Sequence, residues 1–148
     1  MKDFVYAHNG TLESNELLAL FDVVGFNRLG EWNFENVHAI FDNTDYYVLA
    51  KHHGILIGFV RLLTDWHTRG YISNLCVVPK FQHQGVGRQL MQEILTVCDE
   101  KRILVVNVFD TSSSPGFYSK LGFFADPAAT GLLRIRPGSA ATGPGKDD

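Results

Sequence analysis

The sequence has few of the features that mark disulfide-bonded, secreted or membrane-spanning proteins. It contains only two cysteines, Cys76 and Cys98, and neither belongs to a CxxC or Cys/His motif. This usage gives no disulfide framework and is typical of a reducing compartment. No apolar run reaches about 18 residues, the length of a membrane span, and the first residues lack the apolar stretch of a signal peptide. We therefore expect a cytoplasmic protein without a membrane partner.

The chain also lacks a strong charge of either sign. Its 13 lysines and arginines and 16 aspartates and glutamates give a formal net charge of −3. The basic residues are scattered along the chain instead of forming a stripe, so we expect no nucleic-acid partner. The 6 histidines are equally dispersed, and we expect no metal site.

The apolar residues that the sequence does contain are sufficient for one globular domain. At 148 residues with 45% hydrophobic content, such a chain buries roughly 70% of the surface that it exposes when unfolded. We assign residues 1–136 to this domain. Residues 137–148 are rich in glycine, alanine, proline and serine, and we expect a disordered tail there.

Hydrophobic periodicity predicts the element order β-α-α-β-β-β-α-β-α-β, an α/β (α+β) fold with a mixed sheet and helices on both faces. Thr11 or Ser14 is expected to cap the first helix, and Ser114 and Pro115 are expected to open the last one. The later helices are predicted over residues 34–41, 86–101 and 114–121. The strands are predicted over residues 3–8, 46–50, 55–63, 71–78 and 103–109, with a last strand from Phe123.

The loop Gln-His-Gln-Gly-Val-Gly-Arg, residues 82–88, lies between a predicted strand and the most regular predicted helix. Main-chain N–H groups at a helix N-terminus have no partner within the helix, and the helix dipole adds partial positive charge. A pyrophosphate fits such a site, and Gly85 and Gly87 allow it to approach closely. A plain strand-to-helix turn fits the same residues, and neither a Walker loop nor a GxGxxG spacing is present.

The motifs around the loop favour the first interpretation. Leu75-Cys76-Val77-Val78-Pro79 precedes the loop, and the segment FYSKLGF at residues 117–123 follows the next predicted strand. In order and spacing these segments resemble the GNAT superfamily of acetyl-CoA-dependent N-acetyltransferases, over roughly residues 3–135. Residues 22–26, 56–61 and 122–127 are similar to the bacterial and plastid branch related to plant arylalkylamine (serotonin) acetyltransferases.

The resemblance implies a mostly antiparallel sheet that is splayed where acetyl-CoA binds. A bulge near Asn74 is one way to begin the splay. Main-chain groups of one strand would pair with the pantetheine arm, and amides of the loop would hold the pyrophosphate. The implied cofactor-binding residues are Leu75, Cys76, Val77, His83, Gln84, Gly85, Val86, Gly87 and Arg88. Asn107 is a further candidate, and a core hydrogen bond accounts for it equally well.

The reaction would be direct attack of an amine on the thioester carbonyl. A backbone N–H near Leu75 or Cys76 would stabilise the carbonyl oxygen, and Tyr118 is the candidate catalytic acid for the departing thiolate. Without the resemblance, a core aromatic residue beside Phe117 is the favoured interpretation of Tyr118.

The resemblance assigns no general base. The positions at which related enzymes carry a histidine pair or an acidic residue are here Tyr71, Ser73 and Asn74. Asp65, His67 and Asp110 remain candidates for the base. Transfer that relies on the small neutral fraction of the amine needs none of them.

The acceptor is the least specified part of the prediction. Candidate substrate residues are Phe26, Arg28, Trp32 and Trp66, which suit an aromatic or apolar amine or serve only in helix packing. A small-molecule amine is favoured, and a polyamine, a protein amine or a non-catalytic acyl-CoA-binding module are the alternatives. Leu132, Leu133 and Ile135 fit either a homodimer contact or the core of a monomer.

Overall fold

The computed structural model describes residues 3–27, 30–111 and 114–138. Its strands are β1 (Phe4–His8), β2 (Tyr46–His52), β3 (Ile55–Thr64), β4 (Arg69–Val77) and β5 (Val105–Asn107). Its helices are α1 (Ser14–Val24), α2 (Val37–Asp42) and α3 (Val86–Glu100), with the 3-10 turns η1 (Pro79–Phe81) and η2 (Ser119–Leu121). No helix in these residues is both long and apolar enough to cross a membrane.

The strands form one sheet in the order β1-β2-β3-β4-β5. The first three pairings are antiparallel, and β4 pairs with β5 in parallel. This last ladder joins only Arg69, Gly70 and Tyr71 to β5, so the second half of β4 diverges from its neighbour. The predicted fold class, a mixed and mostly antiparallel sheet, is confirmed, and its splayed edge lies between β4 and β5.

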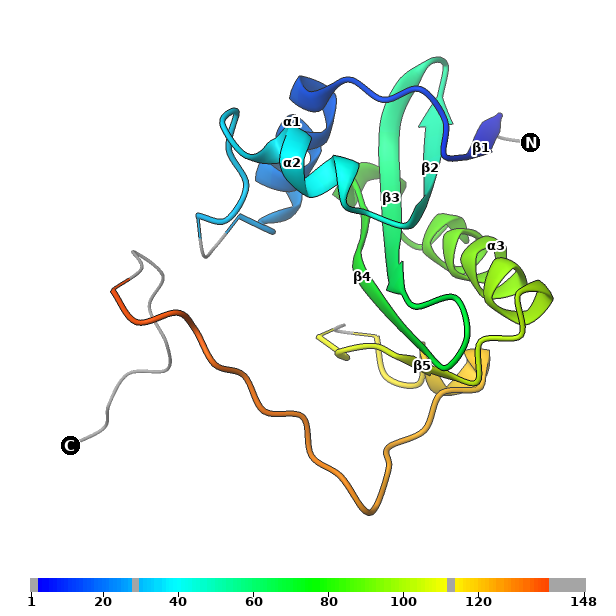
Figure 1. Ribbon diagram of the computed structural model, residues 1–148. Helices are drawn as coiled ribbons and strands as arrows, with labels where there is room; N and C mark the ends of the chain where they lie inside the picture. Colours follow the sequence, from blue (N-terminus) through cyan, green and yellow to red (C-terminus); the bar gives the residue numbers. More distant parts are fainter. Residues whose placement is uncertain (1–2, 28–29, 112–113, 139–148) are drawn as a thin grey trace.

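Helices cover both faces of the sheet (Figure 1). On one face, Leu17 and Phe21 of α1 pack against Phe59 of β3. On the other face, Leu90 of α3 packs in a cluster that contains Val60. Neighbouring residues of β3 therefore face opposite helices, as the two-residue period of a strand requires.

Helix α1 begins with a different cap from the predicted one. The N-cap is Glu13, not Thr11 or Ser14, and its carboxylate accepts a hydrogen bond from the N–H of Glu16. In return, the carboxylate of Glu16 accepts a hydrogen bond from the N–H of Glu13 at 3.0 Å. This reciprocal pair is a capping box with glutamate in the place of serine or threonine.

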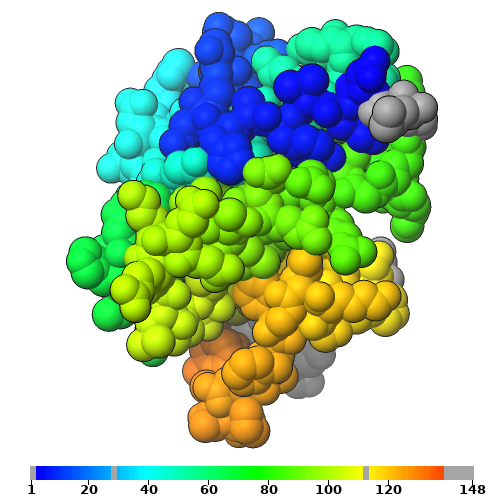
Figure 2. All heavy atoms as spheres, turned by 90° about the vertical axis from the view of Figure 1, so that its right-hand side faces the viewer, coloured from blue at the N-terminus to red at the C-terminus, as the bar shows by residue number. Residues whose placement is uncertain are grey.

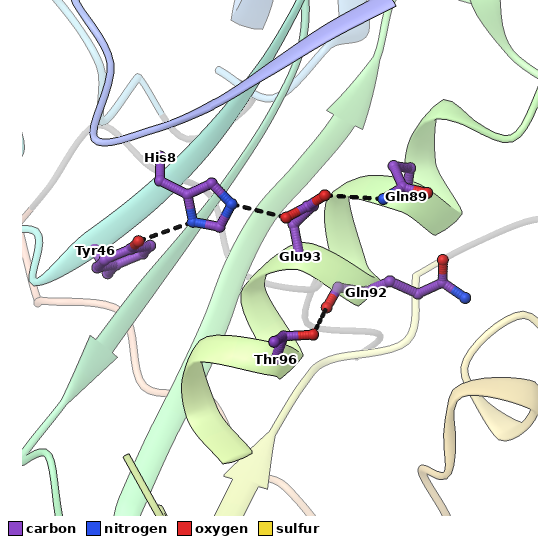
Figure 3. A network of polar contacts seen from close by, with 6 residues as sticks. All are labelled: His8, Tyr46, Gln89, Gln92, Glu93 and Thr96. Carbon is purple, nitrogen blue, oxygen red and sulfur yellow. Dashed lines mark hydrogen bonds and ion pairs between the residues drawn. The ribbon is translucent and has the colours of Figure 1, made fainter. Parts of the chain in front are cut away.

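A polar network ties α3 to the first two strands. Figure 2 shows α3 on one face of the molecule, between β1 and the segment that follows residue 114. Nε2 of His8 on β1 lies 2.8 Å from a carboxylate oxygen of Glu93, to which it donates, and Nδ1 is hydrogen-bonded to the hydroxyl of Tyr46 at 2.8 Å (Figure 3). Gln89 donates to the other oxygen of Glu93 at 2.9 Å. The hydrogen bond from His8 is the main cause that lowers the pKa of Glu93.

The predictions for the chain after β5 are wrong. Residues 114–121 form turns that end in η2 instead of an α-helix, and no strand begins at Phe123 in the described part of the chain. Pro127 cannot donate to a sheet ladder, and it lies in a turn. Leu132 is 90% exposed and Leu133 is 72% exposed, so neither completes the core. Residues 139–148 of the predicted tail lie outside the described residues.

Replacing a core residue of α3 tests this packing. Ile94 is fully buried, and Ile94→Ala is expected to lower the free energy of unfolding by about 2–5 kcal/mol because it leaves a cavity against the sheet. Urea denaturation followed by circular dichroism measures the change. Leu104 is 80% exposed, and Leu104→Ala should change the free energy of unfolding by less than about 0.5 kcal/mol. Equal small effects of the two variants would contradict the described core.

Candidate active site

A groove opens where β4 and β5 diverge, and it encloses about 390 Å³. One wall is the second half of β4, where Leu75, Cys76 and Val77 line the groove, and the other wall includes Phe117 and Tyr118. The remaining lining residues are Val24, Phe26, Gln82, Gly87, Thr111 and Ser114. The structure therefore brings four of the predicted cofactor-binding residues to one groove: Leu75, Cys76, Val77 and Gly87.

The loop before α3 closes one end of this groove. Its backbone turns through left-handed conformations, with φ of 61° at His83 and 84° at Gly85, the N-cap residue. Among the contacts of the described residues, the main-chain N–H groups of residues 83–88 donate to no protein acceptor. Gln82 fixes the loop to the end of β4, because its Nε2 donates to the carbonyl of Val77 at 3.0 Å. These N–H groups are therefore available to an anionic ligand.

A second cavity of about 500 Å³, the side pocket, adjoins the groove. Both are lined by Phe26, Leu75, Thr111 and Tyr118, which mark the junction between them. The side pocket is further lined by Glu31, Tyr71, Ile72, Ser73, Asn74, Phe109, Gly131, Leu132 and Leu133. A molecule in the groove and a second molecule in the side pocket would meet at this junction.

Tyr118 is fixed at the junction by two neighbouring rings. Phe117 and Phe123 pack edge-on to it, with ring centroids 5.0 and 5.7 Å away. Burial first, and then the charges of Asp110 and Tyr71, raise the pKa of Tyr118 above the usual value of 10.0. The hydroxyl is therefore protonated at neutral pH, and it can donate a proton to an anion that forms at the junction.

The family model described as "Acetyltransferase (GNAT) family" matches residues 13–123, which include the loop, β4, β5 and Tyr118. The chain belongs to this family. The predicted superfamily is thereby confirmed. The narrower arylalkylamine branch stays a prediction, because the match does not reach that level.

Relatives of this GNAT chain include plant proteins. Histone acetyltransferase TAP1 of Glycine max is 27% identical over 140 residues, which are 86% of this chain and 58% of that protein. The chloroplastic GCN5-related N-acetyltransferase 2 of Arabidopsis thaliana is 33% identical over 72 residues, 49% of this chain and 28% of that protein. The chain thus spans 58% or less of the length of these curated relatives.

A solved structure shares the fold over nearly its whole length. The GNAT family acetyltransferase SP0256 from Streptococcus pneumoniae TIGR4 aligns with a TM-score of 0.75 and 24% sequence identity. The alignment covers 91% of this chain and 99% of that one. This likeness establishes the fold and leaves the substrate open.

Cys76 lines the groove of this GNAT domain but has none of the properties of a nucleophile. Its side chain is 6% exposed, and burial raises the pKa of its thiol far above the usual range. Because only the thiolate is reactive, Cys76 contributes shape and main-chain groups to the groove.

Two predicted substrate residues do not reach the cavities. Trp32 is 3% exposed and packs against Phe21 with ring centroids 4.6 Å apart. Trp66 packs with Tyr46 on the α3 side of the sheet. The contacts of both tryptophans agree with the alternative interpretation, a role in packing, and Arg28 lies outside the described residues.

The remaining candidates are spread over several places. Asn107 lines a third cavity that lies beyond Tyr118, and it does not line the groove. Asp65 caps the β3–β4 turn, where its carboxylate accepts the hydroxyl of Thr68 at 2.5 Å and three main-chain N–H groups. His67 is exposed in the same turn. Asp110 lines the third cavity beside Tyr118.

The sequence prediction gave no role to Glu31 or to Arg61. Glu31 is the one carboxylate that lines the side pocket in the described residues. Arg61 of β3 is half-buried, and burial lowers the pKa of its guanidinium, while Tyr71 and Glu31 oppose that shift. The sequence feature that could have pointed to Arg61 is its position as the one charged residue in the apolar strand β3. No group of three His, Cys, Asp or Glu side chains in the described residues is placed to hold a metal ion.

Thiol reactivity tests the placement of both cysteines. Burial, with a smaller contribution from Asp99, raises the pKa of Cys98 to about 11, and Cys76 lies higher still. We expect neither thiol to react with a disulfide reagent in the native protein at pH 8, and both to react in guanidinium chloride. Rapid labelling of Cys76 in the native protein would show that the groove wall is open to solvent.

Proposed function

We propose that this chain transfers the acetyl group of acetyl-CoA directly to a primary amine. The observation that carries the proposal is the junction at Leu75 and Tyr118, where the groove and the side pocket meet. Direct transfer requires the two substrates to touch, and a protonated phenol at the point of contact serves the leaving group. Membership of the GNAT family agrees with this reaction.

The groove has the features that acetyl-CoA requires. The second half of β4 offers main-chain groups to the amides of the pantetheine arm, as an added strand would. The free N–H groups of residues 83–88 suit the pyrophosphate. Arg88 and Lys120 line a small cavity that shares Ser114 and Phe117 with the groove, and these two cations suit the remaining phosphate.

The chemistry assigns one proton transfer to Tyr118. The neutral amine nitrogen forms a bond to the thioester carbon, the carbon–sulfur bond breaks, and the amine loses a proton to water or to a base. Tyr118 donates its proton to the departing thiolate and regains one from solvent. No base in the described residues is as well placed as this acid, so transfer through the neutral fraction of the amine fits the site best.

The lining of the side pocket favours a small amine with an apolar or aromatic body. Phe26, Tyr71 and Phe109 provide aromatic surface, and Glu31 provides one carboxylate that can accept a hydrogen bond from the N–H of a neutral amine. An arylalkylamine has this combination, whereas a polyamine would leave most of its charges unpaired. The second candidate is a lysine side chain of a protein, which the name of the Glycine max relative favours.

A panel of amines tests this function. The purified protein is incubated with acetyl-CoA and tryptamine, serotonin, spermidine or a lysine peptide, and thiol release is followed. We expect release with tryptamine and serotonin at lower amine concentrations than with spermidine. Release with the peptide alone would favour the protein acceptor. Acetyl-CoA binding without release would identify a non-catalytic binding module.

Replacement of Tyr118 tests the acid. Tyr118→Phe should lower kcat by about 10²–10⁴-fold and leave the affinity for acetyl-CoA unchanged, because the ring that lines the groove is retained. Steady-state kinetics and calorimetry measure the two quantities. Tyr46→Phe is the matched control, since Tyr46 bonds to His8 away from the groove.

The pH dependence gives an independent measure of the same residue. Because the pKa of Tyr118 is raised above 10.0, the acid form persists at neutral pH and is lost only as the pH rises above about 10. We expect kcat of the wild type to fall in that alkaline range. An equal kcat for Tyr118→Phe and wild type at pH 8 would remove Tyr118 from the mechanism.

A further inference from the structure

The strongest unassigned feature near the junction is a directed hydrogen-bond network around Asn74. Between the pairs Phe59–Cys76 and Arg61–Ser73, β4 contains one residue more than β3. Asn74 lies in this bulge with a left-handed φ of 57°. Asn74 lines the side pocket, next in sequence to Leu75 at the junction.

Arg61 fixes which end of the Asn74 amide faces the pocket. Nε of Arg61 lies 2.7 Å from Oδ1 of Asn74, and the hydroxyl of Ser73 donates to the same oxygen at 3.2 Å. Because a guanidinium has only donors, the atom that faces it must be the amide oxygen. The amide nitrogen donates to no acceptor in the described residues, so its two N–H groups remain for a ligand.

Arg61 is itself held in one orientation. The hydroxyl of Thr44 donates to the carbonyl of Ile40 at 3.0 Å and accepts from Arg61 at 3.3 Å. The guanidinium carbon lies 5.1 Å from the ring centre of Trp32. Each hydrogen bond from Ile40 through Thr44 and Arg61 to Asn74 therefore has a defined donor and acceptor. A cation bonded to the amide oxygen also strengthens the amide N–H as a donor.

The chemistry at the junction limits what these N–H groups can bind. An amide cannot act as a base at neutral pH, and an N–H directed at the attacking nitrogen would occupy the lone pair that the reaction needs. An oxygen is the suitable partner, and the thioester carbonyl oxygen is present with every acceptor. That oxygen gains negative charge when the amine adds to the carbon, so a fixed donor stabilises the transition state.

We propose that the side-chain amide of Asn74, oriented by Arg61 and Ser73, donates a hydrogen bond to the carbonyl oxygen of the acetyl group during transfer. This inference rests on the proposed function. It assigns Asn74 a catalytic role as an electrostatic donor and gives Arg61 the role of a positioning residue. The backbone N–H groups near Leu75 then share this task with a side chain.

Infrared spectroscopy of bound [1-¹³C]acetyl-CoA tests the inference without turnover. A hydrogen bond to the carbonyl lowers its stretching frequency, so the bound band should lie at lower frequency in the wild type than in Asn74→Ala. Arg61→Lys keeps the charge but loses the Nε–H donor, and its band should lie between the two. Asn43→Ala and Arg69→Lys are the matched controls, because both positions are exposed and outside the two cavities.

Kinetics with two related amines complete the test. Asn74→Ala should lower kcat by about 10²–10³-fold for tryptamine and serotonin alike, with acetyl-CoA affinity retained. Because alanine is strained at the left-handed φ of this position, the melting temperature is expected to fall, and kcat is compared at a temperature at which both proteins are folded. Loss confined to the KM for serotonin would overturn the inference, because Asn74 would then bind the acceptor hydroxyl. An unchanged carbonyl band in Asn74→Ala overturns this inference alone, whereas failure of the wild type to bind acetyl-CoA overturns the proposed function as well.

Discussion

The parallel ladder between β4 and β5 stops at Tyr71, and a bulge at Asn74 turns the rest of β4 away from β5. In most sheets such a break would leave main-chain groups unpaired at a buried edge, which is costly. Here the break opens a groove, and a ligand with its own amides can occupy the free edge. The groove, the side pocket and their junction all follow from this one loss of pairing.

The bulge also determines how the two faces of the sheet contribute to the site. Helix α3 packs on one face, and the free N–H groups at its N-terminus belong to an element with six buried residues. On the other face, Arg61 connects Thr44 at the end of α2 with Asn74 in the bulge. A single side chain thus joins the α1–α2 region to the strand that carries the junction.

The sequence predicted the regular elements well because their signals are local. The spacing of Leu90 and Ile94 indicated α3, and the apolar runs of β2, β3 and β4 indicated the central strands. The loop glycines predicted an anion site, and that site stays a prediction. The caps and short elements were less accurate, because Glu13 replaces the usual cap residues and β5 keeps only three of its predicted residues in the ladder.

The junction itself was only partly predictable. Its position on Leu75 and Tyr118 came from motif resemblance, whereas the partners of Asn74 depend on a strand register that no local pattern specifies. Glu31 lines the side pocket from a loop, and Trp32, for which substrate contact and packing were both open, packs against Phe21. Both outcomes depend on tertiary packing, which the hydrophobic periodicity of a sequence does not specify.

Residues 131–133 form one wall of the side pocket. This wall is less tightly packed into the fold than the wall formed by β4. It belongs to a segment outside the sheet, anchored where Gly131 packs so closely on Phe109 that an added Cβ would lie 2.9 Å from the ring. The neighbouring leucines are largely exposed, so exchanging them costs the fold little. Under the proposed function, the acceptor pocket can therefore be reshaped through a few surface positions, whereas substitutions in the groove wall at Cys76 or Val77 also change the core.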